Sequence, residues 1–173
     1  MALINDILRL SQLDEGGALP HEQVSVLELA QEAARSLTAQ AAAQAVHISV
    51  TGTAGTVFGV RRLLYEIARN LCENAVKYNV PGGSVTVEVA ETDRDVTLLV
   101  RDTGIGIPEG DQSRVFERFY RVDKSHSRAI GGTGLGLSIV KHAVAYRRGT
   151  LRLESQPGKG TTITVTLPKE PTE

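Results

Sequence analysis

Tryptophan is absent from the sequence, methionine and cysteine occur once each, and aromatic side chains make up only 4% of the 173 residues. The single Cys72 excludes an internal disulfide framework and a cysteine-rich zinc site. The apolar runs fall far short of the roughly 20 residues that span a bilayer, and no secretory leader is visible. A core with so few aromatic rings has to be built from aliphatic side chains.

Neither sign of charge is in excess, because 19 Lys and Arg stand against 20 Asp and Glu. A net charge of -1 provides no general attraction to nucleic acid or to an anionic membrane. We therefore expect no nucleic-acid partner and no direct membrane contact. The composition, 41% hydrophobic and 23% charged, is that of a folded globular domain. Glycine, with 17 residues, is somewhat more abundant than average.

Hydrophobic periodicity predicts a mixture of helices and strands. Residues 15–20 interrupt the first helical pattern and indicate a linker. Elements mixed in this order indicate an α/β or α+β sandwich. Helices are expected over residues 1–14, 23–43, 61–78 and 137–146, and strands over residues 46–50, 85–89, 96–100, 151–154 and 162–167.

Two asparagines, Asn70 and Asn74, lie four residues apart on a predicted helix, so their amides project from one face. Amide oxygens are suitable ligands for a hard cation such as Mg²⁺, and the ammonium group of Lys77 suits a phosphate. The ring of Tyr78 is suited to cover a heteroaromatic surface. The alternative is an ordinary solvated helix face.

A carboxylate at the end of a predicted strand is followed by two closely spaced glycines in the segment DTGIGIP, which begins at Asp102. Gly104 and Gly106 allow the backbone to approach a flat ligand, and Asp102 can accept a hydrogen bond from an amine such as that of adenine. The alternative is a simple turn, since Asp and Gly favour turns. Ile105 and Ile107 are unusual residues for such a turn.

A glycine run, GGTGLGLS, starts at Gly131 and ends where a helix is predicted to begin. The backbone N–H groups of such a run, together with a helix N-terminus, form an anion site suited to phosphates. The run is neither a Walker A loop nor a dinucleotide-binding fingerprint, because its spacing is GxGxG and no strand precedes it. The alternative is a flexible loop without a ligand.

Residues 114–128, between these two segments, are rich in basic and aromatic side chains. Such a stretch can form a mobile lid whose cations reach a phosphate, or an exposed surface helix. The basic residues are Arg114, Arg118, Arg121, Lys124 and Arg128, and the aromatic residues are Phe116, Phe119 and Tyr120. Elsewhere, the four histidines lack zinc-ligand spacing, and Cys72 is expected to be a small buried side chain.

The order of these segments is more specific than any one of them. NLCENAVKY is followed by DTGIGIP, VFERFYR, GGTGLGLS and SQPGKGTTITVTLP. From about Val24 to Pro168 this order resembles the ATP-binding catalytic domain of bacterial two-component sensor histidine kinases, and within them most closely the phosphate-regulon type. The resemblance implies the Bergerat (GHKL) fold, an α/β two-layer sandwich in which about three helices back a mixed sheet of about five strands.

The resemblance also assigns roles by position and implies ATP and Mg²⁺ as cofactors. Asn70 and Asn74 would hold the metal and phosphate, and the residues implied to be catalytic are Asn70, Lys77, Arg118 and Arg121. Those implied to contact the base are Tyr78, Asp102, Gly104, Gly106 and Ile107, with Gly158, Gly160 and Thr161 closing the site near Asp102. Those implied to cradle phosphates are Thr133, Gly134, Leu135 and Gly136, and Phe116 and Phe119 would anchor the lid.

The family's domain order implies the remaining boundaries and partners. Residues 1–15 resemble the end of the second dimerisation helix, residues 16–22 a linker and residues 23–170 the catalytic domain. Expected partners are the protein's own dimerisation domain, with its phosphoacceptor histidine upstream of Met1, a response regulator, and a second copy in a homodimer. We expect the cytoplasmic domain of a plasma-membrane sensor. His21 imitates the acceptor's His-Glu dipeptide but lies in the linker, and we do not expect it to be phosphorylated.

Two departures from the family pattern stand out. Val60 replaces an Asp that caps the asparagine helix, and the Arg147-Arg148-Gly149 segment replaces His-Gly-Gly, which we expect to be a surface change. Related ATPases place a general-base Glu where this chain has Asn70. Its absence favours transfer to a neutral imidazole over hydrolysis. The alternatives are a nucleotide-binding regulatory module without transfer activity, and a related ATPase whose phosphate release depends on Glu66.

Overall fold

The structure is a computed structural model that describes residues 20–122 and 132–170. The predicted helix over residues 1–14, most of the predicted linker and part of the predicted lid lie outside these residues. Lys124, Arg128 and Gly131 are among the residues of that lid and glycine run which are not described.

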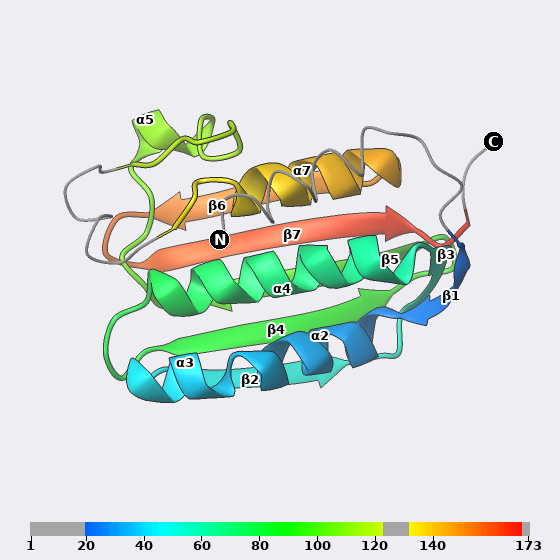
Figure 1. The fold of residues 1–173 in the computed structure, drawn as a ribbon, viewed down its shortest axis with the longest axis horizontal. Coiled ribbons are helices and arrows are strands. Elements are labelled where there is room, and N and C mark those ends of the chain that lie inside the picture. The colour runs from blue at the N-terminus through cyan, green and yellow to red at the C-terminus, as the bar shows by residue number, and fades with distance from the viewer. Residues whose placement is uncertain (1–19, 123–131, 171–173) are drawn as a thin grey trace.

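The described residues form a five-stranded sheet, a two-stranded sheet and a set of helices (Figure 1). The strands are β1 (Glu22–Ser25), β2 (His47–Gly52), β3 (Thr56–Gly59), β4 (Ser84–Glu91), β5 (Asp95–Asp102), β6 (Thr150–Gln156) and β7 (Gly160–Pro168). The helices are α2 (Val26–Ser36), α3 (Thr38–Ala43), α4 (Arg61–Lys77), α5 (Glu109–Gln112) and α7 (Gly136–Tyr146).

The large sheet is mixed, with strand order β2-β4-β5-β7-β6. The pair β2–β4 is parallel, and the other three neighbouring pairs are antiparallel. Helices α2, α4 and α7 cover the same face of this sheet in Figure 1. The predicted α/β two-layer sandwich, with a mixed sheet of five strands backed by three long helices, is confirmed.

The core lies between the helices and the sheet and is aliphatic, as the scarcity of aromatic residues predicts. Because successive side chains of a strand point to opposite faces, each central strand buries every second residue. The buried residues of β4, β5 and β7 are Val85, Val87, Val89, Val96, Leu98, Val100, Ile163, Val165 and Leu167. The helices contribute Leu29, Ala33, Leu64, Ile67, Leu71, Val140 and Val144, and the thiol of Cys72 is fully buried among them.

The helix predicted over residues 23–43 is wrong in two places. Its first residues form β1, which pairs antiparallel with β3, and Ser25 caps α2 by accepting a hydrogen bond from the Glu28 N–H at 3.3 Å. The helical path then breaks at Leu37. The hydroxyl groups of Ser36 and Thr38 donate to main-chain carbonyls near the end of α2, an alternative to continued helix that these residues favour.

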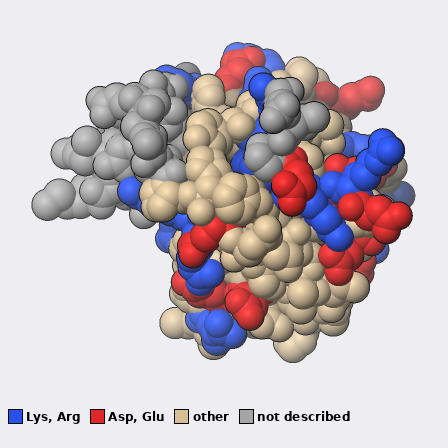
Figure 2. All heavy atoms as spheres, turned by 90° about the vertical axis from the view of Figure 1, so that its right-hand side faces the viewer, with Lys and Arg blue, Asp and Glu red and all other residues tan. Residues whose placement is uncertain are grey.

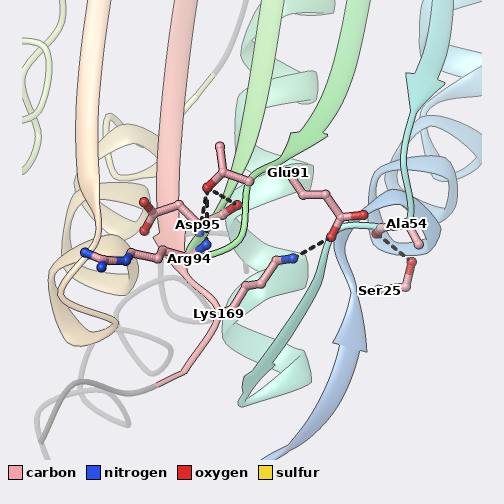
Figure 3. A network of polar contacts seen from close by, with 7 residues as sticks. Ser25, Ala54, Glu91, Arg94, Asp95 and Lys169 are labelled. Atoms are coloured by element: carbon pink, nitrogen blue, oxygen red, sulfur yellow. Dashed lines mark hydrogen bonds and ion pairs between the residues drawn. The ribbon is translucent and has the colours of Figure 1, made fainter.

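The two-stranded sheet is joined to the large sheet at the end of β5 that is remote from Asp102. The main chain of Lys169 accepts from the Phe58 N–H at 2.9 Å and donates to the Arg94 carbonyl at 2.8 Å. The ammonium of Lys169 lies 2.9 Å from Glu91, and the Ser25 hydroxyl donates to the Ala54 carbonyl (Figure 3). Figure 2 shows uncharged residues in the middle of this end of the molecule, with basic and acidic side chains intermixed around them.

Arg147 was predicted to be a surface residue, and this is wrong. Its side chain is only 4% exposed, and its guanidinium donates to the Pro168 carbonyl at 2.9 Å. Burial lowers the pKa of Arg147 below its usual value. Gly59 leaves room for the guanidinium, since a Cβ there would lie 3.3 Å from Arg147 Nε. The buried Arg147 therefore ties the end of α7 to the end of β7.

Replacing Arg147 with alanine is expected to lower the free energy of unfolding by about 2 kcal/mol, because the half-buried Pro168 carbonyl loses its charged donor and a buried side chain is removed. Urea denaturation followed by circular dichroism measures this change. The matched control is Arg152→Ala, since Arg152 is 75% exposed and its ion pair with Glu154 lies at the surface; we expect it to change stability by less than about 0.5 kcal/mol. Equal stabilities of the two variants would show that the Arg147 contact contributes nothing.

Candidate nucleotide-binding site

The segments selected from the sequence meet at one end of the sandwich. The C-terminal end of α4, the N-terminal end of α7, the short α5 and the turn between β6 and β7 lie together at the left of Figure 1. Asp102 ends β5 at this same end. A site assembled here draws on four separate parts of the chain.

Asn70 and Asn74 lie on α4 beside the start of α7. The position that a Cβ would take at Gly136 is 3.1 Å from Asn70 Oδ1 and 3.8 Å from Asn74 Nδ2. Val60 precedes α4 and gives it no side-chain cap, as the sequence predicts. Apolar residues at helical spacing bury the opposite face of α4 in the core, so the two amides are held toward the N-terminus of α7.

Lys77 and Tyr78 follow at the end of α4. The ammonium of Lys77 lies 5.2 Å from the centre of the Tyr78 ring, within the range of a cation–π contact. Burial lowers the pKa of Lys77, the nearby positive charge of Arg121 lowers it further, and Glu73 opposes both effects. A Cβ at Gly132 would collide with Lys77 Nζ, so Lys77 lies directly against the glycine-rich segment. Lys77 and Arg121 together place positive charge beside that segment.

Asp102 is the half-buried carboxylate of the site. Its Oδ1 accepts hydrogen bonds from the N–H groups of Gly104 at 2.8 Å and Thr161 at 3.2 Å. Burial raises the pKa of Asp102, and these two hydrogen bonds act in the opposite direction. Because both bonds use Oδ1, they hold that oxygen in place, and Oδ2 is not needed for them and can accept from a ligand.

The loop after β5 is held closely against its neighbours. The Ile105 N–H donates to the Tyr78 carbonyl at 3.1 Å, and the Ile105 carbonyl accepts from the Gly158 N–H at 2.8 Å. Gly160 has φ +90, and a Cβ there would collide with the Asp102 carbonyl. A residue other than glycine would therefore be both strained and crowded at position 160. The loop, α4 and the β6–β7 turn form one continuous set of contacts.

Ser155 is part of this site but was not selected from the sequence. Its hydroxyl accepts from the Ile107 N–H at 2.8 Å, donates to the Gly160 carbonyl at 3.0 Å and lies 2.8 Å from Thr161 Oγ1. The Gln112 amide donates to the carbonyls of both Ile107 and Ser155. A single serine in an alternating strand carries no signal of this role, because its partners lie far away in the sequence.

The described part of the predicted lid contacts the glycine-rich segment and helix α7. The Phe119 N–H donates to the Gly134 carbonyl at 3.0 Å, and the Phe119 ring is 58% exposed. Arg118 lies 3.3 Å from His142 Nε2 on α7. Of the two arginines selected as catalytic, Arg121 is the one whose charge acts on Lys77 and Tyr78.

The glycine-rich segment is anchored by Leu135, whose side chain is fully buried against Ile139. The Leu135 N–H donates to Thr133 Oγ1 at 3.4 Å. The side chain of Leu135 is therefore part of a small core, and only its backbone is in a position to meet a ligand. Residues 132–135 lead into α7, which begins at Gly136, so the segment precedes a helix N-terminus of the kind that binds anions.

The arrangement is suited to a nucleotide. The fixed carboxylate of Asp102 can read an exocyclic amine, and Lys77, Arg121 and the start of α7 can neutralise phosphates. Among residues 20–122 and 132–170, no group of three His, Cys, Asp or Glu side chains could hold a metal ion by itself. No helix in this part of the chain has the length and apolarity needed to cross a membrane. The fold and these residues define a nucleotide-binding α/β sandwich.

Comparison with known proteins identifies the family. Residues 59–171 match the family described as "Histidine kinase-, DNA gyrase B-, and HSP90-like ATPase", and the chain belongs to this family. It is 42% identical over 173 residues to the sensor-like histidine kinase SenX3 of Mycolicibacterium smegmatis, covering 98% of this chain and 44% of SenX3. It is 49% identical over 105 residues to the sensor histidine kinase WalK of Bacillus subtilis, covering 60% of this chain and 17% of WalK.

Solved structures of histidine kinases have the same fold as this chain. The mycobacterial sensor histidine kinase MprB superposes with a TM-score of 0.75 at 33% identity, covering 88% of this chain and all of that one. Full-length ShkA in complex with AMPPNP superposes with a TM-score of 0.82 at 26% identity, covering 96% of this chain and 35% of ShkA. The chain therefore contains the ATP-binding catalytic domain of sensor histidine kinases, and it spans less than half the length of SenX3.

Proposed function

We propose that this domain transfers the γ-phosphate of Mg-ATP to a histidine on the dimerisation domain of the same protein. One observation carries the proposal: Asn70 and Asn74 both lie within 4 Å of the Gly136 position at the start of α7. This arrangement brings two amide groups to a helix N-terminus, and Lys77 lies against Gly132 in the preceding segment, as a triphosphate with a divalent cation requires. The AMPPNP complex of ShkA supports a triphosphate ligand.

Each residue has a proposed role. Asp102 Oδ2 accepts from the adenine amine, Tyr78 covers the base, and Gly104, Gly106, Ile107 and Thr161 shape its pocket. Thr133, Gly134, Leu135 and Gly136 contact phosphates through their backbone. Lys77 and Arg121 neutralise charge on the transferred group, and Arg118 does so only if it leaves His142.

Mg²⁺ fits the residues present, because amide oxygens are hard ligands and a metal held mainly by phosphates and water needs few protein ligands. Asn70 would hold it through Oδ1, and Asn74 would do so with its amide turned so that the oxygen, rather than Nδ2, faces Gly136. When bound, Mg²⁺ would supply neutralisation of phosphate charge. Lys77, which lies against Gly132, and the nearby Arg121 would orient the same phosphates. Asn70 stands where related ATPases have a general-base Glu and cannot itself act as a base. This suits a neutral imidazole acceptor, which needs no base near pH 7.

The whole protein's partners follow from this role. We propose that it acts as a homodimer whose dimerisation domain carries the acceptor histidine, and that it signals to a response regulator. We also propose that residues 1–15, which lie outside the described residues, belong to the end of the second dimerisation helix and that residues 16–22 belong to a linker, of which Glu22 already begins β1. We propose that the domain is the cytoplasmic part of a plasma-membrane sensor. His21 lies beside Phe58, with ring centres 5.9 Å apart, and is not the acceptor.

A three-way assay tests the proposal. The chain is incubated with Mg-ATP labelled on the γ-phosphate, with and without a purified dimerisation domain that contains its acceptor histidine. We expect acid-labile, base-stable label on that domain and no steady release of phosphate. Binding of ATP without label transfer would favour the regulatory module, and steady phosphate release that depends on Glu66 would favour the ATPase.

Replacing Ser155 with alanine is expected to weaken ATP binding about tenfold, because the Ile107 N–H loses its acceptor and Thr161 loses its neighbour beside the proposed adenine pocket. Isothermal titration calorimetry measures the dissociation constant. Ser49→Ala, on the edge strand β2, is the matched control. Binding of inorganic triphosphate should be unchanged in both variants, and an unchanged ATP affinity in Ser155→Ala would contradict the proposed role.

A further inference from the structure

Glu66 is one of four buried polar or charged residues in the described part of the chain, and its side chain is adjacent to Asn70. It is 7% exposed and Asn70 is 8% exposed. The Asn70 side-chain amide donates to the Glu66 carbonyl at 2.8 Å and to Glu66 Oε2 at 3.2 Å. Burying a carboxylate is costly unless it is hydrogen-bonded, and Asn70, the proposed metal ligand one helical turn away, donates a hydrogen bond to Glu66.

The hydrogen bond from Asn70 to Glu66 affects which end of the Asn70 amide faces the site. An asparagine side chain has two N–H donors on Nδ2 and one acceptor oxygen, and the two ends can exchange places by rotation. Here both donors of Asn70 are directed to Glu66, so Oδ1 is the group left facing the start of α7, 3.1 Å from the Gly136 Cβ position. The reverse orientation would place Oδ1 against a carbonyl and a carboxylate, which repel it, and would present N–H groups to a cation.

We infer that Glu66 is a positioning residue: its carboxylate holds the Asn70 amide with Oδ1 facing the phosphate and metal position. This inference rests on the proposed function, because it gives the reason why Asn70 would present oxygen there. Glu66 touches neither nucleotide nor metal in this role. Its negative charge also lies one hydrogen bond behind Asn70, where it strengthens the polarisation of the amide oxygen.

The role differs from that of a general base. A base would have to reach a water or hydroxyl next to the γ-phosphate, whereas the Glu66 carboxylate is directed at Asn70 Nδ2, away from Oδ1. The main-chain carbonyl of Glu66 also accepts from Nδ2. Removal of the Glu66 side chain should therefore weaken the preference for one amide orientation without abolishing it.

The test measures how much Mg²⁺ tightens nucleotide binding. Dissociation constants of AMPPNP are determined by calorimetry in Mg²⁺ and in EDTA for the wild type, Glu66→Leu, Glu66→Gln, Asn70→Ala and the double variant Glu66→Leu/Asn70→Ala. We expect Glu66→Leu to lose about tenfold of the Mg²⁺-dependent tightening, with metal-free affinity unchanged within about twofold. Glu66→Gln should recover most of it, because its Oε1 can accept from Asn70 Nδ2. When Asn70 is already alanine, Glu66→Leu should not change the Mg²⁺-dependent tightening of AMPPNP binding any further.

The outcomes separate this inference from the function on which it rests. Wild-type protein that binds AMPPNP without any Mg²⁺ dependence would overturn both the metal role of Asn70 and the inference. Normal Mg²⁺ dependence in Glu66→Leu would overturn the inference alone, as would equal effects of Glu66→Leu with and without Asn70. If Glu66→Leu does not fold, NMR of the wild type and Glu66→Gln decides: we expect the Asn70 Nδ2 protons to exchange slowly with water, and rapid exchange of both in the wild type would overturn the inference.

Discussion

Replacing Asp102 with asparagine is expected to weaken ATP binding about 100-fold, which corresponds to about 2.7 kcal/mol. The N–H groups of Gly104 and Thr161 both donate to Oδ1, so an asparagine would keep its oxygen at that position. Its NH₂ group would then replace Oδ2 and face the amine of adenine, donor against donor. The affinity therefore falls through the loss of a charged acceptor and through a new repulsion.

Calorimetric titration with ATP measures the effect. Asp95→Asn is the matched control, because Asp95 begins the same strand whose last residue is Asp102. We expect the control to bind ATP as the wild type does. The wild-type affinity should also fall as the pH falls through the pKa of Asp102, which burial raises above its usual value. The protonated carboxyl is no longer a charged acceptor for the adenine amine. Full affinity in Asp102→Asn would show that the base is read elsewhere.

Replacing Lys77 with methionine is expected to slow label transfer from ATP to the acceptor histidine about 100- to 1000-fold, the usual effect of removing one preorganised charge from a transition state. Lys77 lies against the glycine-rich segment at Gly132, beside Arg121. Methionine is an unbranched side chain one atom shorter than lysine and carries no charge, so the change removes mainly the ammonium group that lies over the Tyr78 ring.

Initial rates of labelling at saturating ATP measure this loss. Lys141→Met is the matched control, since Lys141 is exposed on α7, and it should label at the wild-type rate. Because Lys77 would act mainly on the transferred phosphate, ADP affinity should change far less than the rate. A Lys77→Met variant that transfers phosphate at the wild-type rate would remove Lys77 from the proposed mechanism.

Much of the fold could be predicted because its periodic segments are long. The apolar stripe of Leu64, Ile67 and Leu71 predicted α4, and the alternation in β4, β5 and β7 predicted three strands, which the structure places side by side in the sheet. The candidate site could be predicted where a side chain suited to ligand binding is followed directly by loop-forming glycines, as at Asp102. The other site residues were predicted from the order of the segments along the chain, because no single motif excluded an ordinary turn, loop or solvated helix face.

What could not be predicted depends on contacts between distant residues. Strands β1 and β3 are only four residues each, and they are held by each other and by Lys169 rather than by a pattern of their own. The charge of Arg147 indicated a surface position, whereas its partner is a carbonyl 21 residues away. Ser155 has its main partner, Ile107, 48 residues away. Contacts of this kind leave no local signal in the sequence.

The central claim is that the loop after β5, the end of α4 and the start of α7 bind one nucleotide, with its base at Asp102 and its phosphates at residues 132–136. Titration of the isotopically labelled chain with Mg-AMPPNP, followed by two-dimensional NMR, tests it most directly. We predict large amide shifts at Gly104, Gly106 and Thr161 and at Gly134 and Gly136, all with one dissociation constant, and none at β1 or β3. Shifts confined to another surface, or different dissociation constants for the two groups of residues, would contradict the account.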